Sequence, residues 1–89
     1  MNLKEFIQTH WANYDQCAFD LGVSHRTIVN YVHTNPTGIL KHTAAVVQKD
    51  NVEPLTLFDA VAISIEQMNE NRVKAGKSPQ LNSHGSTNI

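Results

Sequence analysis

The segment FDLGVSHRTIVNYV, residues 19–32, places one glycine between two short helical patterns. Glycine adopts the left-handed backbone conformation at little cost, so Gly22 is predicted to end the first of these helices. Ser24 comes two residues later and is a favoured N-cap, so a second helix is predicted from there to about His33. An elbow of this kind in a chain of only 89 residues predicts one small all-α domain of about five helices.

The N-terminal part of the chain carries further helix signals. Asn2 is followed three residues later by Glu5, and this pair forms a capping box. Either Asn13 or Asp15 is placed to cap the helix that leads into the elbow. Residues 33–38, HTNPTG, predict a loop, because Asn precedes Pro and a Gly follows.

The second half of the chain is less uniform in its signals. Residues 39–49 have the spacing of a helix, but their β-branched side chains would also suit a strand, and we favour the helix. A long C-terminal helix is predicted next, with Thr56 and Asp59 as its capping box. Gly76 is the predicted stop of that helix.

Composition narrows the classes of function. The single cysteine, Cys17, excludes an internal disulfide and any metal site built from cysteine pairs. The start of the chain lacks the pattern of a signal peptide, and the longest apolar run, AVAISI, is too short to span a bilayer, so we expect a cytoplasmic protein. No catalytic arrangement, phosphate loop or histidine pair at metal-binding spacing stands out. We therefore expect neither an enzyme nor a cofactor, a metal or a small-molecule ligand.

Residues 14–33 resemble the helix-turn-helix of phage and plasmid transcriptional regulators, of the Cro/CI-like or CII-like type. Ala18 stands four residues before Gly22, where the two helices of that unit cross and only a small side chain fits. Apolar residues occupy the surrounding positions of the pattern, which are Cys17, Leu21, Val23, Ile28 and Tyr31. Tyr31 departs from the aliphatic residue or tryptophan that is usual there, and its hydroxyl is expected to be free to reach a phosphate.

The resemblance implies that the second helix of the unit reads DNA from the major groove. Arg26 has the geometry to pair with guanine, Asn30 with adenine, and Val29 with a thymine methyl group. Ser24 and Thr27 are expected to hold phosphates, although Ser24 also has to serve as the helix cap. The predicted DNA-binding residues are Ser24, His25, Arg26, Thr27, Val29, Asn30 and His33.

The charge balance of the chain predicts that a single subunit binds DNA weakly. The whole chain has a formal net charge of −1, and residues 1–50 carry equal numbers of basic and acidic side chains before histidine is counted. Modest phosphate neutralisation predicts a shallow salt dependence, so useful affinity requires two subunits on one palindromic operator. The long helix offers an apolar stripe for contact between the two copies, formed by Phe58, Val61, Ile65 and Met68. The same stripe is expected to help cover the core of its own domain.

The chain is therefore divided into a DNA-binding region (1–50), a packing and dimerisation helix (51–76) and a disordered polar tail (77–89). We expect a transcriptional regulator, most simply a repressor of a promoter on a phage or plasmid. A CII-like activator, with Asp15 and Asp20 as a weak acidic patch, and an excisionase-type factor remain alternatives. So does an antitoxin-type module that binds a protein through its C-terminal helix or tail. The sequence leaves open the operator, the sign of regulation and the choice between dimer and tetramer.

Overall fold

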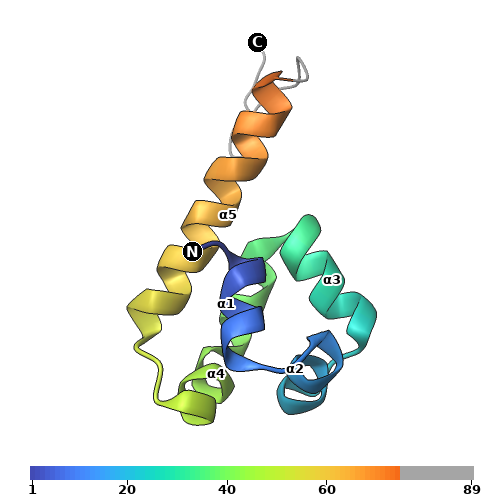
Figure 1. The fold of residues 1–89 in the computed structure, drawn as a ribbon, viewed down its shortest axis with the longest axis vertical. Helices are drawn as coiled ribbons and strands as arrows, with labels where there is room; N and C mark the ends of the chain where they lie inside the picture. Colours follow the sequence, from blue (N-terminus) through green and yellow to red (C-terminus); the bar gives the residue numbers. More distant parts are fainter. Residues whose placement is uncertain (75–89) are drawn as a thin grey trace.

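The computed structural model describes residues 1–74, and within them the chain is helical with no strand. The all-α prediction is confirmed, with five α-helices and one 3-10 helix in this part of the chain (Figure 1). In chain order they are α1 (Leu3–His10), α2 (Tyr14–Leu21), α3 (His25–His33), η1 (Pro36–His42), α4 (Thr43–Asp50) and α5 (Pro54–Lys74).

The predicted N-caps of the first three helices are confirmed. The Asn2 side chain accepts a hydrogen bond from the Glu5 amide (2.9 Å), and the Glu5 carboxylate accepts one from the Asn2 amide (2.8 Å), which completes the capping box. Asn13 rather than Asp15 caps α2, since its side-chain oxygen accepts from the Gln16 amide at 2.9 Å. The Asp15 carboxylate is therefore left for another role.

In the middle of the chain the predicted loop needs correction, and the helix favoured for residues 39–49 is confirmed. The loop expected over residues 33–38 is replaced from Pro36 onward by η1, because proline holds the backbone angle that a helical first turn needs. Residues 39–49 form no strand: the first four complete η1 and the rest lie in α4. The long helix begins inside the range predicted for it, residues 51–76, but before its proposed capping box. Pro54 is its first residue, so the proposed capping box of Thr56 and Asp59 falls inside the helix and is wrong.

α4 and α5 are joined by a tight reversal. Asn51 ends α4 in the left-handed conformation (φ 55°), which asparagine tolerates better than most residues. The Thr56 amide then donates to the Glu53 carbonyl at 2.9 Å as α5 begins. The predicted end of the helix at Gly76 and the predicted polar tail, residues 77–89, lie outside the described residues.

α1 is the centre of the domain. Its Leu3, Phe6 and Ile7 side chains are completely buried, and the helix packs against α5 on one side and α2 on the other (Figure 1). The Leu3 amide donates to the Ser64 hydroxyl of α5 at 2.7 Å in a buried hydrogen bond, and the Asn2 side chain donates to that of Gln67 at 2.9 Å. The N-terminus of α1 is thus fastened to the middle of α5, whose last turns extend beyond the other helices (Figure 1).

Replacing Ser64 with alanine should destabilise the fold. The buried Leu3 amide would lose its acceptor, which typically costs about 1–3 kcal/mol in the free energy of unfolding. Urea denaturation followed by circular dichroism measures the change. Gln67→Ala is the matched control, because it removes an exposed bond to the same end of α1 and should cost less. An equal loss in the two variants would contradict a special role for the buried bond.

Candidate nucleic-acid interface

The elbow between α2 and α3 is closed by backbone hydrogen bonds. Gly22 adopts the left-handed conformation (φ 71°, ψ 31°), and its amide donates to the Phe19 carbonyl at 3.2 Å. The Val23 amide donates to the Ala18 carbonyl at 2.9 Å, so the last carbonyls of α2 are satisfied by a Schellman turn. A Cβ at Gly22 would meet no atom within 4 Å, so the glycine is required for its backbone angle and not for space.

The two helices of the elbow share a buried interface. Cys17, Ala18 and Leu21 of α2 and Ile28, Tyr31 and Val32 of α3 all lie in the core, and Val23 packs against it. All the apolar positions that carried the resemblance therefore face inward, as predicted. Burial, with the nearby charge of Asp20, raises the pKa of the Cys17 thiol to about 12, so the thiol stays protonated and is a poor nucleophile.

Ser24 and Thr27 are already engaged at the start of α3. The Ser24 hydroxyl oxygen accepts from the Thr27 amide (3.2 Å) and lies 3.0 Å from the Thr27 hydroxyl oxygen. Ser24 is therefore the N-cap of the helix, as expected. Because both hydroxyl groups remain at least partly exposed, contact with a phosphate would add to this cap and would not have to replace it.

The remaining predicted contact residues share an exposed surface of α3. His25, Arg26, Asn30 and His33 are exposed, and Val29 is half-buried at the edge of the same surface. Helical spacing puts Arg26, Asn30 and His33 on one face. We call the exposed side of α3 from Ser24 to His33 the α3 face. The helix contains no acidic residue, so this face carries only neutral and basic groups of its own.

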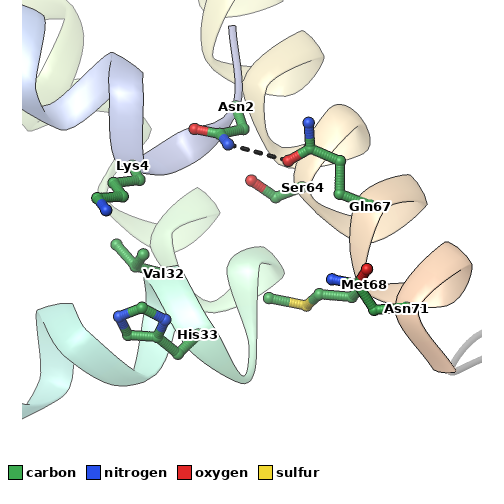
Figure 2. A pocket seen from close by; sticks show the side chains of 8 residues that line it. All are labelled: Asn2, Lys4, Val32, His33, Ser64, Gln67, Met68 and Asn71. Carbon is green, nitrogen blue, oxygen red and sulfur yellow. Dashed lines mark hydrogen bonds between the residues drawn. The ribbon is translucent and has the colours of Figure 1, made fainter. Parts of the chain in front are cut away.

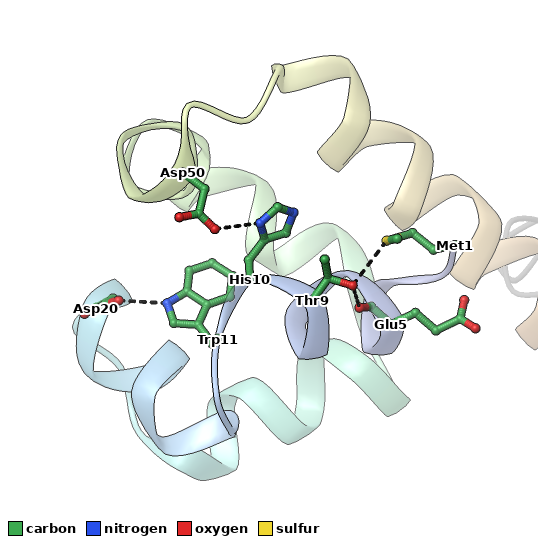
Figure 3. A network of polar contacts seen from close by, with 7 residues as sticks. All are labelled: Met1, Glu5, Thr9, His10, Trp11, Asp20 and Asp50. Atoms are coloured by element: carbon green, nitrogen blue, oxygen red, sulfur yellow. Dashed lines mark hydrogen bonds and ion pairs between the residues drawn. The ribbon is translucent and has the colours of Figure 1, made fainter.

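Asp15 and Asp20 both accept hydrogen bonds from other elements. Asp15 Oδ1 lies 2.6 Å from His25 Nδ1, which links α2 to the first residue of α3. The indole N–H of buried Trp11 donates to Asp20 Oδ2 at 2.7 Å (Figure 3). Phe19, between them in sequence, is 81% exposed. The two carboxylates expected as an acidic patch are thus tied to their own domain.

Sequence reasoning missed these two contacts and a third one. His10 Nδ1 lies 2.7 Å from Asp50 Oδ2 and joins α1 to the end of α4 (Figure 3). His10 and Asp50 are 40 residues apart in the sequence, and Asp15 and His25 are 10 residues apart. No local spacing rule of a helix reaches so far, so nothing in the sequence signalled these pairs.

The Tyr31 ring faces inward as predicted, but its hydroxyl is not free as expected. The side chain is buried, and its hydroxyl oxygen lies 3.1 Å from His42 Nε2 of η1. Burial, with the charge of Lys41, lowers the pKa of His42, which favours the neutral imidazole as the partner. A Cβ at Gly38 would lie 2.5 Å from the Tyr31 ring, so the ring needs this glycine beside it. Tyr31 fastens η1 to α3, and its hydroxyl is paired with His42 instead of being free as expected.

A groove borders the C-terminal end of the α3 face (Figure 2). It has a volume of about 230 Å³ and runs between the end of α3, the start of α1 and the middle of α5. Asn2, Lys4, Val32, His33, Ser64, Gln67, Met68 and Asn71 line it. The Lys4 and His33 side chains lie on the same side of this groove, and no carboxylate lines it. Lys4 therefore extends the basic character of the α3 face onto α1, a contribution that sequence reasoning did not identify.

The predicted dimerisation stripe on α5 is divided between two faces. Val61 is only 4% exposed and lies in its own domain's core with Leu57 and Ala60, so its assignment to a dimer contact is wrong. Ile65 packs partly against this core, and Met68 lines the groove. Phe58 is 43% exposed, since it lies on the face of the helix that the domain does not cover.

Comparison with protein-family models, curated proteins and solved structures finds no match to this chain. Within residues 1–74, no helix combines the length and apolar character needed to cross a membrane. The same residues bring no three His, Cys, Asp or Glu side chains together as a metal site would require. The features of the described residues that bear on function are therefore the α3 face and α2, the helix that supports it.

Replacing Gly22 with alanine should weaken the fold without filling any space. Alanine would have to adopt the left-handed conformation of Gly22, which should lower the free energy of unfolding by about 1–2 kcal/mol. Gly22→Asn is the control, because asparagine tolerates that conformation and should cost less. Thermal unfolding of the two variants beside the parent chain measures both. An alanine variant as stable as the parent would contradict the left-handed turn.

Proposed function

We propose that this protein is a sequence-specific DNA-binding transcriptional regulator that acts as a homodimer on a palindromic operator. One observation carries the proposal. The α3 face is an exposed helical surface without an acidic residue, and α2 supports it through the left-handed turn at Gly22. A capped helix joined by a short turn to a supporting helix is the arrangement with which helix-turn-helix proteins enter the major groove.

Five residues of the α3 face have roles that follow from their chemistry. Arg26 donates in a fork that matches the O6 and N7 atoms of guanine, and Asn30 matches the N6 and N7 atoms of adenine. Val29 touches a thymine methyl group. Ser24 and Thr27, with the first amides of α3, hold phosphates and set the position of the helix without reading bases.

The charge balance supports a dimer. The net charge of −1 makes non-specific attraction to phosphate weak, and Lys4 and His33 beside the groove add only local basic character. Two copies that bind two half-sites together would supply the affinity that one copy lacks. The uncovered face of α5, with Phe58 and the 68%-exposed Leu55, is the surface that we propose for this contact.

Repression fits the domain better than activation. An activator of the kind considered from the sequence would present Asp15 and Asp20 to the polymerase, and both carboxylates are bonded within the domain. Occlusion of a promoter needs only occupancy of the DNA. We therefore propose a cytoplasmic repressor, of the kind that phage and plasmid promoters use, as the most economical function.

Arg26→Ala tests whether the α3 face reads bases. A preferred site is first enriched from random duplexes with the parent protein, and fluorescence anisotropy then compares that site with a scrambled duplex at two salt concentrations. The variant should lose about 1–3 kcal/mol of specific binding and relax one base position. Arg72→Ala, an equal change of charge at an exposed position on α5, is the control and should bind as the parent does.

Two outcomes would count against the proposal. Unchanged affinity of Arg26→Ala for the enriched site would remove Arg26 from base reading. Equal, weak and salt-sensitive binding of the parent to every duplex would leave only contact with phosphates.

Phe58→Ala tests the dimer surface. Truncation of an aromatic side chain at the centre of an interface should weaken self-association on the order of tenfold, as measured by sedimentation at several concentrations. Phe19→Ala is the matched control, because it removes the same ring from a more exposed position on α2. A stronger effect at Phe19 than at Phe58 would place the interface on α2 instead.

A further inference from the structure

We infer that Asp15 is a positioning residue that determines which DNA bases His25 can read. The inference rests on the proposed function and adds a specificity determinant that lies outside the α3 face. Asp15 belongs to α2, and His25 is the first residue of α3. In the proposed complex the N-terminal end of α3 lies at the base edges in the major groove. The contact between them, 2.6 Å from Oδ1 to Nδ1, is a direct hydrogen bond between side chains of α2 and α3.

The contact determines where the imidazole carries its proton. An ionised carboxylate only accepts hydrogen bonds, so His25 Nδ1 must carry a hydrogen and donate it to Asp15. In the neutral ring the other nitrogen, Nε2, is then an acceptor with a free lone pair. Without Asp15, a neutral imidazole is free to carry its proton on Nε2 and to act there as a donor.

The two tautomers would read different groups in the major groove. An Nε2 acceptor fits an exocyclic amino group, either N4 of cytosine or N6 of adenine. An Nε2 donor fits O6 or N7 of guanine, or O4 of thymine. Asp15 thus selects cytosine or adenine at the base that His25 faces, although Asp15 itself need not touch DNA.

The surroundings of the pair agree with this role. The side chains of His25 and Asp15 are 56% and 75% exposed, so the ring is held from one side and remains accessible from the other. The Tyr14 ring lies 6.0 Å from the His25 ring, centre to centre and tilted by 50°, and limits rotation on that side. An acidic residue next to a DNA-binding helix repels phosphates, and its bond to His25 gives a reason for its position in spite of that repulsion.

The first experiment needs no DNA. Long-range ¹H–¹⁵N NMR at pH 8 distinguishes a protonated Nδ1 from a protonated Nε2 in each histidine. We expect the parent protein to show His25 protonated at Nδ1, and Asp15→Ala to shift the proton towards Nε2. Asp59→Ala, which removes an exposed carboxylate of α5, is the control and should leave His25 unchanged. A parent protein with its His25 proton on Nε2 would overturn the inference.

The second experiment measures base preference at pH 8 on the enriched site. The base that His25 faces is the position at which His25→Ala loses discrimination. At that position the parent should favour cytosine or adenine, and Asp15→Ala should reduce the preference about fivefold or more. The preference at the base read by Arg26 should stay the same, which separates positioning from general damage to the fold. In a His25→Ala background, Asp15→Ala should have no further effect on base preference.

Failure of the inference is distinguishable from failure of the proposed function. If the parent binds one site specifically but Asp15→Ala keeps its preference, or gains affinity equally for all duplexes, Asp15 does not position His25. If the parent shows no specific site, the regulator itself is rejected, and the role of Asp15 with it. The amide NMR spectrum of Asp15→Ala verifies that the variant is folded in each case.

Discussion

The left-handed backbone at Gly22 fixes the direction in which α3 leaves α2, and most of the domain follows from that direction. The turn satisfies the Ala18 and Phe19 carbonyls, so α2 ends there in a defined geometry. Ser24 can then start a new helix at once. Ile28 on one side of α3 reaches the core, while Arg26 on the other side stays in solvent. The elbow therefore produces both the packing and the exposed face.

A small domain also has to hold its short helices in place. α1 has only eight residues, too few to be stable alone, and its stability depends on burial of its apolar side chains and on its bonds to α5. The Trp11 indole and the His10 ring then connect the same helix to α2 and α4 (Figure 3). These polar contacts give the Asp20 and Asp50 carboxylates partners within the domain, and they add to the apolar packing that holds α1 in place.

Sequence reasoning succeeded where the cause is local. The caps at Asn2 and Ser24 and the stop at Gly22 depend on a few neighbouring residues and were predicted correctly, and Asn13 was one of the two residues predicted to cap α2. It failed where tertiary packing decides. Val61 has the same period as Phe58, and only the position of α1 determines which of them is covered. The contacts of Asp15 and Asp20 depend on how the helices pack together, so the proposed positioning of His25 by Asp15 could not be predicted from the sequence.

The projecting end of α5 has a geometric consequence. The helix is continuous over 21 residues, or about 30 Å, and most of its contacts with the body lie in its first half. Along this projecting arm of α5, up to Lys74, each residue advances the helix by about 1.5 Å and rotates it by about 100°. Reach and orientation are therefore coupled. Only steps of about seven residues, close to two full turns, lengthen the arm while keeping its end pointed the same way.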